Sequence, residues 1–272
     1  MSGGSIIESA KTKLRVSLCC YQELSNWPRV FAQIGLSHLH FRWVVFKVRS
    51  RKGVELRVPN NRTSRWALLE SLALDAYRIG NYPWPDPNGP RQVLDIGAHV
   101  GSFTCSLAAV LPGATFTCVE PSVQTSEWLS KNLERNNLSG RATVLSVAVS
   151  DVDGPIDYWY DDAVSGENSL EKGTRHHKIL VDGLSISSIF ALMTKPPDIV
   201  KLDCEGGEYA SILGGSSELY KSTNHVFLEY HPIEGHSFQE LLHRLEEFGL
   251  HLEWHETGHI RDQGMAYFTR RK

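Results

Sequence analysis

From Val93 to the end of the chain, short apolar runs of β type alternate with stretches whose apolar residues recur at helical spacing. This alternation predicts an α/β fold with a mostly parallel sheet covered by helices on both faces. The expected strands, each with the helix that follows it, are 93–96 with 102–111, 115–120 with 123–136, 142–149 without an assigned helix, 197–203 with 207–220, and 225–230 with 237–248. Two late β-type runs, 251–256 and 264–270, predict an antiparallel hairpin at the C-terminal edge of the sheet.

The first 88 residues have a more mixed pattern, and we expect an N-terminal α+β extension that contacts substrate or a second copy of the chain. Two β-rich runs flank Arg51-Lys52-Gly53 and predict a hairpin. A helix is expected behind a Thr-Ser start, with an apolar face of Trp66, Leu68, Leu69, Leu72 and Leu74. A stretch rich in proline and glycine then separates this extension from the main domain, which we place at 89–272.

Composition narrows the class of protein. The chain has 272 residues, 41% of them hydrophobic, which is enough for one large domain with a sizeable core. Its net charge of -3 and pI of about 6.5 give no overall attraction to nucleic acid or to an anionic membrane. Five cysteines without a Cys-x-x-Cys pair do not make a disulfide framework. Because no leader pattern and no run of about 18 apolar residues is seen, we expect a soluble, cytoplasmic protein without a membrane partner.

The segment after the first strand of the main domain carries the clearest functional signal. Gly97 and Gly101 let the main chain approach a ligand at the carboxyl end of that strand, where parallel sheets bind their ligands. Glu120 ends the next strand 19 residues after Gly101, where a carboxylate can accept both ribose hydroxyls of a nucleoside. A helix cap or a surface acid is the structural alternative for Glu120.

Two nucleoside cofactors compete for this turn. A dinucleotide needs Gly-x-Gly-x-x-Gly, and no register from Gly97 supplies all three glycines. S-adenosylmethionine has no phosphate but carries a sulfonium cation and an α-amino acid, which suit a carboxylate at Asp95 before the turn. The sequence therefore favours S-adenosylmethionine. A nicotinamide-dependent oxidoreductase, for which a Tyr-x-x-x-Lys relay is also missing, is the least favoured function.

Distinctive blocks lie between Val93 and Pro232, namely VLDIGAHVGSFT, CVEPS with LSKNLERNNL, VAVSD with Gly154, DIVKLDCEGGEYASILGG and VFLEYHP. Together they resemble the FkbM-type S-adenosylmethionine-dependent methyltransferases. His99 and Gly207 depart from the Asn and Ala that the family often has there. The resemblance implies a Rossmann-like, seven-stranded class I methyltransferase fold with the terminal antiparallel strand inserted. It also implies O-methylation of a hydroxyl on a small molecule, such as a sugar or natural-product intermediate.

The resemblance further implies which residues hold S-adenosylmethionine. The corresponding positions are Asp95, Gly97, Ala98, His99, Gly101, Glu120, Ser122, Ala148, Val149 and Asp203. The turn residues surround the amino-acid moiety and ribose, Glu120 binds the ribose hydroxyls, and Ser122 helps to hold the adenosine. Ala148 and Val149 lie along the adenine, and Asp203 faces the methionine end near the reacting methyl group.

Methyl transfer to an alcohol requires the acceptor oxygen to lie in line with the departing sulfur and to lose its proton. Candidates for these tasks end two neighbouring strands, and they are Asp203, Glu205, Glu229 and His231, with Glu208 one helical step further. We expect His231 to be the general base because imidazole titrates near neutrality. Glu205 could bind the acceptor or act as the base. Lys201, in an otherwise apolar strand, is expected to pair with one of these acids.

A magnesium ion held by Asp203, Glu229 and His231 would lower the pKa of the acceptor hydroxyl, and it is a second, less favoured hypothesis. The motif His255-Glu-Thr-Gly-His259 lacks the His-Glu-x-x-His order of zinc enzymes and is expected to be a surface turn. The polar segment 160–178 would either fold over the acceptor, with Asn168 and Ser169 facing the pocket, or be a linker.

The expected partner is a small hydroxylated acceptor. Enzymes that methylate amino groups of DNA and RNA place an Asn/Asp-Pro-Pro-aromatic tetrad after the fourth strand, where this chain has Asp203-Cys-Glu-Gly. A nucleic acid is therefore a disfavoured partner, and a nucleic-acid or protein methyltransferase is the second candidate function. A second copy of the chain, forming a homodimer, is a further candidate partner.

Overall fold

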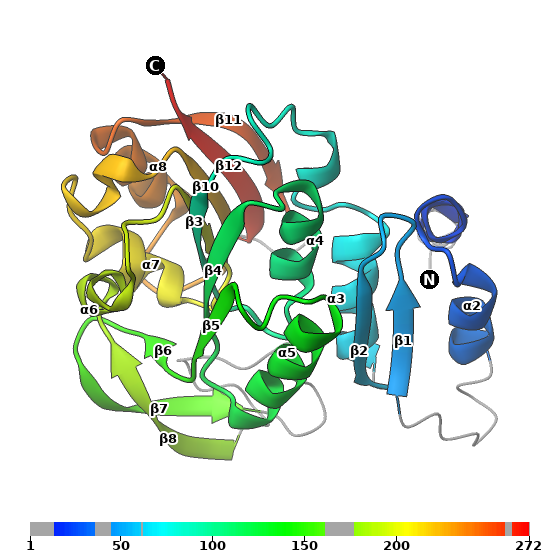
Figure 1. The fold of residues 1–272 in the computed structure, drawn as a ribbon. Helices are drawn as coiled ribbons and strands as arrows, with labels where there is room; N and C mark the ends of the chain where they lie inside the picture. Colours follow the sequence, from blue (N-terminus) through cyan, green and yellow to red (C-terminus); the bar gives the residue numbers. More distant parts are fainter. Residues whose placement is uncertain (1–13, 36–44, 61, 161–176, 259–262, 272) are drawn as a thin grey trace, which may run out of the picture.

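The computed structural model describes residues 14–35, 45–60, 62–160, 177–258 and 263–271. Within these residues, the main sheet contains β3 (Arg91–Ile96), β4 (Ala114–Val119), β5 (Ala142–Leu145), β9 (Ile199–Leu202), β10 (His225–Tyr230), β11 (Leu250–Thr257) and β12 (Gly264–Arg270). Their order is β11-β12-β10-β9-β3-β4-β5, and β12 runs antiparallel between β10 and β11 (Figure 1). The other neighbouring strands pair in parallel. The expected seven-stranded α/β fold, with its antiparallel hairpin at the C-terminal edge, is confirmed.

Helices cover both faces of this sheet (Figure 1). One layer contains α4 (Ser102–Val110) and α5 (Val123–Arg135), and the other contains α6 (Ile186–Leu192), α7 (Gly207–Leu213) and α8 (Phe238–Glu247). Successive strand residues alternate between the two buried clusters, with Val93 in one and Leu94 in the other. Because both faces are covered, all four residues of β9 are buried, as expected for a central strand.

The N-terminal residues form a two-stranded sheet that packs against α5. The expected hairpin is β1 (Val45–Arg49) and β2 (Glu55–Pro59), and it lies near α2 (Trp27–Gly35) and α3 (Arg62–Leu72), on the right of Figure 1. Residues 14–23 are also helical. Val48 and Leu56 of the hairpin belong to the same buried cluster as the α4 and α5 side chains. The division of the chain at residue 88 stays a prediction.

Side-chain amides bond both edges of this hairpin. On the β2 edge, Asn132 of α5 accepts from the N–H of Arg57 and donates to its carbonyl oxygen, both at 3.0 Å. Asn136 does the same with Glu55, at 3.0 and 2.8 Å. On the β1 edge, the amide of Gln33 donates to a strand carbonyl at 3.0 Å. These amides replace the strand partners that an edge strand lacks.

Two expected elements are shorter in the structure. The run 142–149 is two strands, and its second half, β6 (Ala148–Val149), belongs to a separate sheet with β7 (Gly154–Tyr160) and β8 (His177–Leu184). An apolar run shows burial but not which sheet buries it, so the break was not predicted. The helix expected at 207–220 ends at Leu213, because Gly214 and Gly215 follow and favour a helix end. A short 3-10 helix, η3 (Leu219–Ser222), comes after them.

Fewer residues of the N-terminal helix α3 are buried than its apolar sequence pattern predicts. Leu68, Leu69 and Leu72 are buried, whereas Trp66 is 45% exposed. Leu74 follows the end of α3, and the chain then enters the turn that precedes η2 (Ile79–Asn81). The pattern was therefore right for the helix but wrong for two of its five apolar positions.

Three further expectations concern the surface and the loops. Across the described ranges, no helix combines the length and the apolar character needed to cross a membrane. Asn168, Ser169 and His259 lie outside the described residues. His255 is not in a surface turn, because it lies half-buried in β11 with its Nε2 atom 2.8 Å from the Tyr230 hydroxyl.

Candidate active site

The turn between β3 and α4 brings bare main chain against the end of β9. Gly97, His99 and Gly101 have φ angles of 74°, 48° and 84°, in the left-handed region that glycine adopts most easily. A Cβ atom on Gly97 would lie 1.7 Å from the carbonyl oxygen of Asp203, so a larger residue does not fit there. The buried Ala98 donates its N–H to the last carbonyl of β4 at 3.0 Å. Three neighbouring strands therefore meet at this turn.

Glu120 directly follows β4, and its carboxylate binds the same turn. Its Oε2 atom accepts the N–H of His99 at 3.1 Å, and its Oε1 atom accepts the N–H of Ser122 at 3.0 Å. Glu120 is only 6% exposed, so it is not a surface acid, and the cap of α5 is instead the hydroxyl of Ser122, which accepts from Thr125. Burial raises the pKa of Glu120 to about 7, although both hydrogen bonds favour the ionised form.

Asp95 and Lys201 form a buried ion pair behind the turn. Asp95 is fully buried, accepts the Thr104 hydroxyl at 2.6 Å and lies 3.5 Å from the Lys201 ammonium. The same ammonium donates to the carbonyl oxygen of Gly97 at 2.7 Å and lies 3.1 Å from Oδ2 of Asp203. The expected pairing of Lys201 with a nearby acid is confirmed. Asp95 therefore contacts the residues that support the turn, and it is not among the residues that line the cavity of about 70 Å³ next to the turn.

The structure brings the four catalytic candidates together. Asp203 and Glu205 follow β9, Glu229 is on β10 and His231 follows that strand. The Nε2 atom of His231 lies 3.6 Å from Glu205 and 3.9 Å from Glu229. Asp203, Glu229 and His231 each offer one atom to a group whose atoms lie within 4.8 Å of one another. On the other side of the ring, Nδ1 of His231 is 3.1 Å from the fully buried carboxylate of Glu208, in the first turn of α7.

Neighbouring charges set the protonation of this group. Burial favours the neutral ring of His231, but the carboxylates of Glu208, Glu205 and Asp203 together outweigh burial and raise the pKa to about 10. Burial raises the pKa of Glu229 to about 8, and the charge of Asp203 adds to this shift. Although burial opposes it, Lys201 holds the pKa of Asp203 below its usual range. At neutral pH, His231 is therefore protonated and Asp203 is ionised, and among Asp203, Glu229 and His231 it is Glu229 whose pKa is closest to neutrality.

This electrostatic setting contradicts the reason for choosing His231 as the general base. That prediction assumed an imidazole with a pKa near neutrality, whereas this ring keeps its proton up to about pH 10. The carboxylate with the largest effect, Glu208, is 23 residues away in sequence and on a different element. Spacing alone could not show that the two side chains meet.

Two candidate residues come from the N-terminal region and were not predicted. The Tyr77 hydroxyl donates to Oδ2 of Asp203 at 3.0 Å and lies 3.4 Å from Oε2 of Glu229. Glu70 of α3 lines a cavity of about 70 Å³ together with Tyr77, the glycine turn and both carboxylates. Burial raises the pKa of Glu70 to about 6. Neither residue belongs to a motif, so the apolar face of α3 was the sole sequence signal near them.

The residues expected beside the adenine lie at the start of the second sheet. Ala148 and Val149 form β6, and each is 3% exposed. A Cβ atom on Gly207 would lie 2.7 Å from Cγ1 of Val149, which explains why this chain has glycine at 207. Contact of these two residues with adenine stays a prediction.

Comparison with known proteins identifies a family whose sequence pattern matches this chain. Residues 95–252, more than half of the chain, match the family described as Methyltransferase FkbM domain. No curated protein matches the sequence.

Solved structures show partial similarity to the chain. A methyltransferase FkbM from Methylobacillus flagellatus has 16% identity and a TM-score of 0.46, over 75% of this chain and 53% of that one. A precorrin-6y C5,15-methyltransferase from Geobacter metallireducens has 11% identity and a TM-score of 0.45, over 74% and 89%. Fibrillarin from Aeropyrum pernix, solved with S-adenosyl-L-methionine, has 12% identity and a TM-score of 0.46, over 85% and 96%. The chain thus spans about half the length of the Methylobacillus protein.

Proposed function

The chain belongs to the FkbM methyltransferase family, and from this premise we propose that it transfers the methyl group of S-adenosylmethionine to a hydroxyl oxygen of a small molecule. The observation that carries the proposal is the meeting of two half-sites at the carboxyl ends of the strands. One half is the glycine turn with Glu120, and the other is the group of acids and histidine after β9 and on β10. The close approach of Gly97 to Asp203 joins them. As the acceptor class we propose a sugar or a natural-product intermediate.

The residues of the first half-site fit S-adenosylmethionine. Each oxygen of the Glu120 carboxylate accepts one backbone hydrogen bond, which leaves lone pairs for two ribose hydroxyls. Gly97, Ala98 and His99 of the turn line the cavity of about 70 Å³, so an amino-acid moiety can lie against this part of the chain. The turn lacks the middle glycine that a pyrophosphate requires, so a dinucleotide fits less well. In this arrangement Asp203 faces the methionine end and β6 lies along the adenine.

The second half-site supports transfer to oxygen. When bound, S-adenosylmethionine would supply a methyl carbon made electrophilic by its sulfonium sulfur. Glu229 is the proton acceptor that we propose, because a carboxylate with a pKa of about 8 is a stronger base than an ordinary one. His231, which is protonated, donates a hydrogen bond to the acceptor oxygen as negative charge develops there. Asp203, paired with Lys201, stays ionised and does not compete for the proton.

Two measurements test this function. Calorimetric titration with S-adenosylhomocysteine tests the first half-site, and we expect binding by the full chain. Incubation with methyl-labelled S-adenosylmethionine and a panel of sugars and other hydroxylated metabolites tests transfer. Methylation of a hydroxyl in the panel would support the proposal. Binding of NAD in place of S-adenosylhomocysteine would overturn the cofactor, and methylation of RNA or protein but of no small molecule would overturn the acceptor class.

A further inference from the structure

The hydroxyl of Tyr77 lies between two carboxylates of the candidate active site. Its oxygen is 3.0 Å from Oδ2 of Asp203 and 3.4 Å from Oε2 of Glu229. A phenol carries one hydrogen, and the shorter distance assigns that hydrogen to Asp203. The Lys201 ammonium, at 3.1 Å, contacts the same Oδ2 atom. Tyr77 and Lys201 therefore both donate to the Asp203 carboxylate, whereas the Glu229 carboxylate does not receive the Tyr77 hydrogen.

Packing fixes the ring that carries this hydroxyl. Tyr77 is 9% exposed, and its ring packs edge-on against Phe103 and Phe227, with centroid distances of 5.2 and 6.3 Å. Phe103 is on α4, directly after the glycine turn, and Phe227 is on β10, the strand that carries Glu229. The position of the hydroxyl is thus set relative to both half-sites.

The main chain on either side of Tyr77 is held as well. Asp75 and Arg78 have φ angles of 47° and 55°, a region that non-glycine residues occupy only where their surroundings enforce it. The Asp75 carboxylate accepts the N–H of Gly80 at 2.9 Å. The Arg78 guanidinium lies 4.4 Å from the ring centroid of Trp254 and forms an ion pair with the same strand, β11. The contacts of Asp75 and Arg78 therefore fix the main chain on both sides of Tyr77, and with it the position of the Tyr77 side chain.

From this geometry we infer that Tyr77 is a positioning residue for methyl transfer, whose hydroxyl holds the Asp203 carboxylate so that Glu229 faces the acceptor proton. The inference rests on the proposed function and adds a residue outside the range 95–252 that matches the family. A residue that only filled space among the aromatic rings would need the ring but not the hydroxyl. Tyr77→Phe removes the oxygen and keeps the ring, so it separates the two roles.

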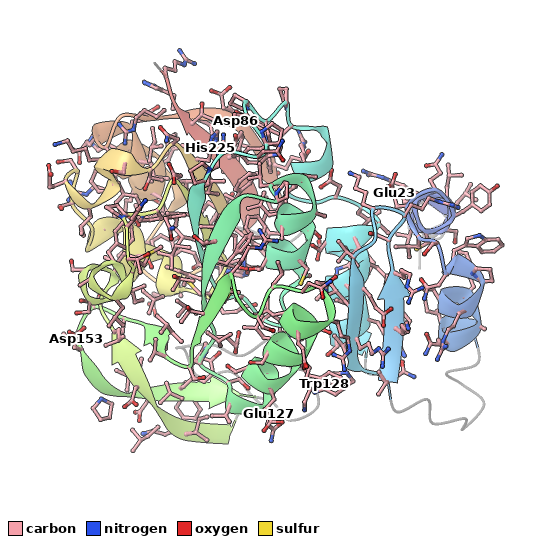
Figure 2. The ribbon with its side chains drawn as sticks, viewed as in Figure 1. Glu23, Asp86, Glu127, Trp128, Asp153 and His225 are labelled. Carbon is pink, nitrogen blue, oxygen red and sulfur yellow. The ribbon has the colours of Figure 1, made fainter. Side chains whose placement is uncertain are left out.

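The test uses the full chain and two probes that differ at the reacting position. S-adenosylhomocysteine has a bare sulfur there, whereas sinefungin has a carbon that bears an amine, whose positive charge reports on the carboxylates nearby. Calorimetry gives the ratio of the two affinities for the parent, for Tyr77→Phe and for the control Tyr82→Phe. The Tyr82 ring packs against Trp84 and His225 at the amino end of β10, away from the active site (His225 is labelled in Figure 2).

We expect Tyr77→Phe to lower the ratio of sinefungin affinity to S-adenosylhomocysteine affinity by about 2- to 10-fold, as the loss of one hydrogen bond would. The affinity for S-adenosylhomocysteine itself should not change, and Tyr82→Phe should keep the parental ratio. A parental ratio in Tyr77→Phe overturns the inference and leaves the proposed function intact. A parent that binds neither probe overturns the proposed function, and the inference with it.

A double-mutant cycle keeps the test decisive if Tyr77→Phe also lowers the melting temperature. In an Asp203→Ala background, Tyr77→Phe should change the affinity ratio by less than about 2-fold, because the hydroxyl no longer has the side-chain oxygen to which it donates. The same fold-change in both backgrounds would show that Tyr77 does not act through Asp203 and would overturn the inference.

Discussion

The carbonyl oxygen of Asp203 lies 1.7 Å from the position that a Cβ on Gly97 would take, so these two residues approach each other through main chain alone. The contact presses the end of β9 against the turn after β3. It also joins the two half-sites of the proposed enzyme. Gly53, in the β1–β2 turn, offers a contrast, because it has a φ of 90° but nothing within 4 Å of a Cβ.

Gly97→Ala should therefore be far more damaging than Gly53→Ala. Both changes place a side chain at positive φ, which costs about 1–3 kcal/mol, but only the first also displaces Asp203. We expect Gly97→Ala to lose at least about 3 kcal/mol of unfolding free energy and to lose S-adenosylhomocysteine binding. Urea unfolding and calorimetry measure both effects. Equal losses in the two variants would show that the approach to Asp203 is unimportant.

Glu120→Ala should weaken binding of S-adenosylhomocysteine by about 1–3 kcal/mol, because two ribose hydroxyls lose their acceptor. Glu127→Ala is the matched control, since Glu127 is an exposed acid on α5 that pairs with Lys131 at 3.4 Å (labelled in Figure 2). Calorimetry on both variants checks the assignment. Identical affinity in Glu120→Ala and the parent would remove Glu120 from the cofactor site.

The pH dependence should separate Glu229 from His231 as the base. The kcat/KM value should rise as pH increases through about 8, where Glu229 loses its proton, and fall above about 10, where His231 loses its own. Glu229→Gln should lower kcat by about 10²–10⁴ and abolish the rise, and His231→Ala should lower kcat but keep the rise. If His231→Ala abolishes the rise instead, the imidazole is the base.

Removal of divalent metal should have little effect. The Lys201 ammonium at 3.1 Å already balances the charge of Asp203, and the protonated His231 ring lies 3.9 Å from Glu229. We therefore expect EDTA to leave both methyl transfer and S-adenosylhomocysteine affinity unchanged. Loss of transfer in EDTA that magnesium restores, with cofactor affinity intact, would favour the magnesium hypothesis for Asp203, Glu229 and His231.

The fold was predictable where its signals are local. Buried parallel strands such as β3 and β9 are apolar runs in the sequence, and some elements are followed by a glycine that marks their end, such as Gly97 after β3 and Gly214 after α7. The second sheet was missed because β6 continues the apolar run of β5, and pairing with β8 is not a local property. Similarly, the exposure of Trp66 depends on which neighbours pack against α3, and its own sequence window does not contain them.

The site residues that lie at the carboxyl ends of the parallel strands could be predicted from the sequence. Glu120, Asp203 and Glu229 each lie at the carboxyl end of a strand, and such ends converge on one edge of a sheet. Tyr77 meets Asp203 across 126 residues of sequence, from a turn with no motif. The protonation of His231 could not be predicted either, because it depends on the buried carboxylate of Glu208, which α7 brings close to the ring.

The amides of Asn132 and Asn136 have a consequence for how copies of the chain can meet. An open strand edge offers its N–H and C=O groups to any passing strand, which is a common route to aggregation and to exchanged segments. The groups of Arg57 and Glu55 on the outer edge of β2 are already taken by these two amides. Addition of a strand from a second copy of the chain is thus closed off at that edge of β2.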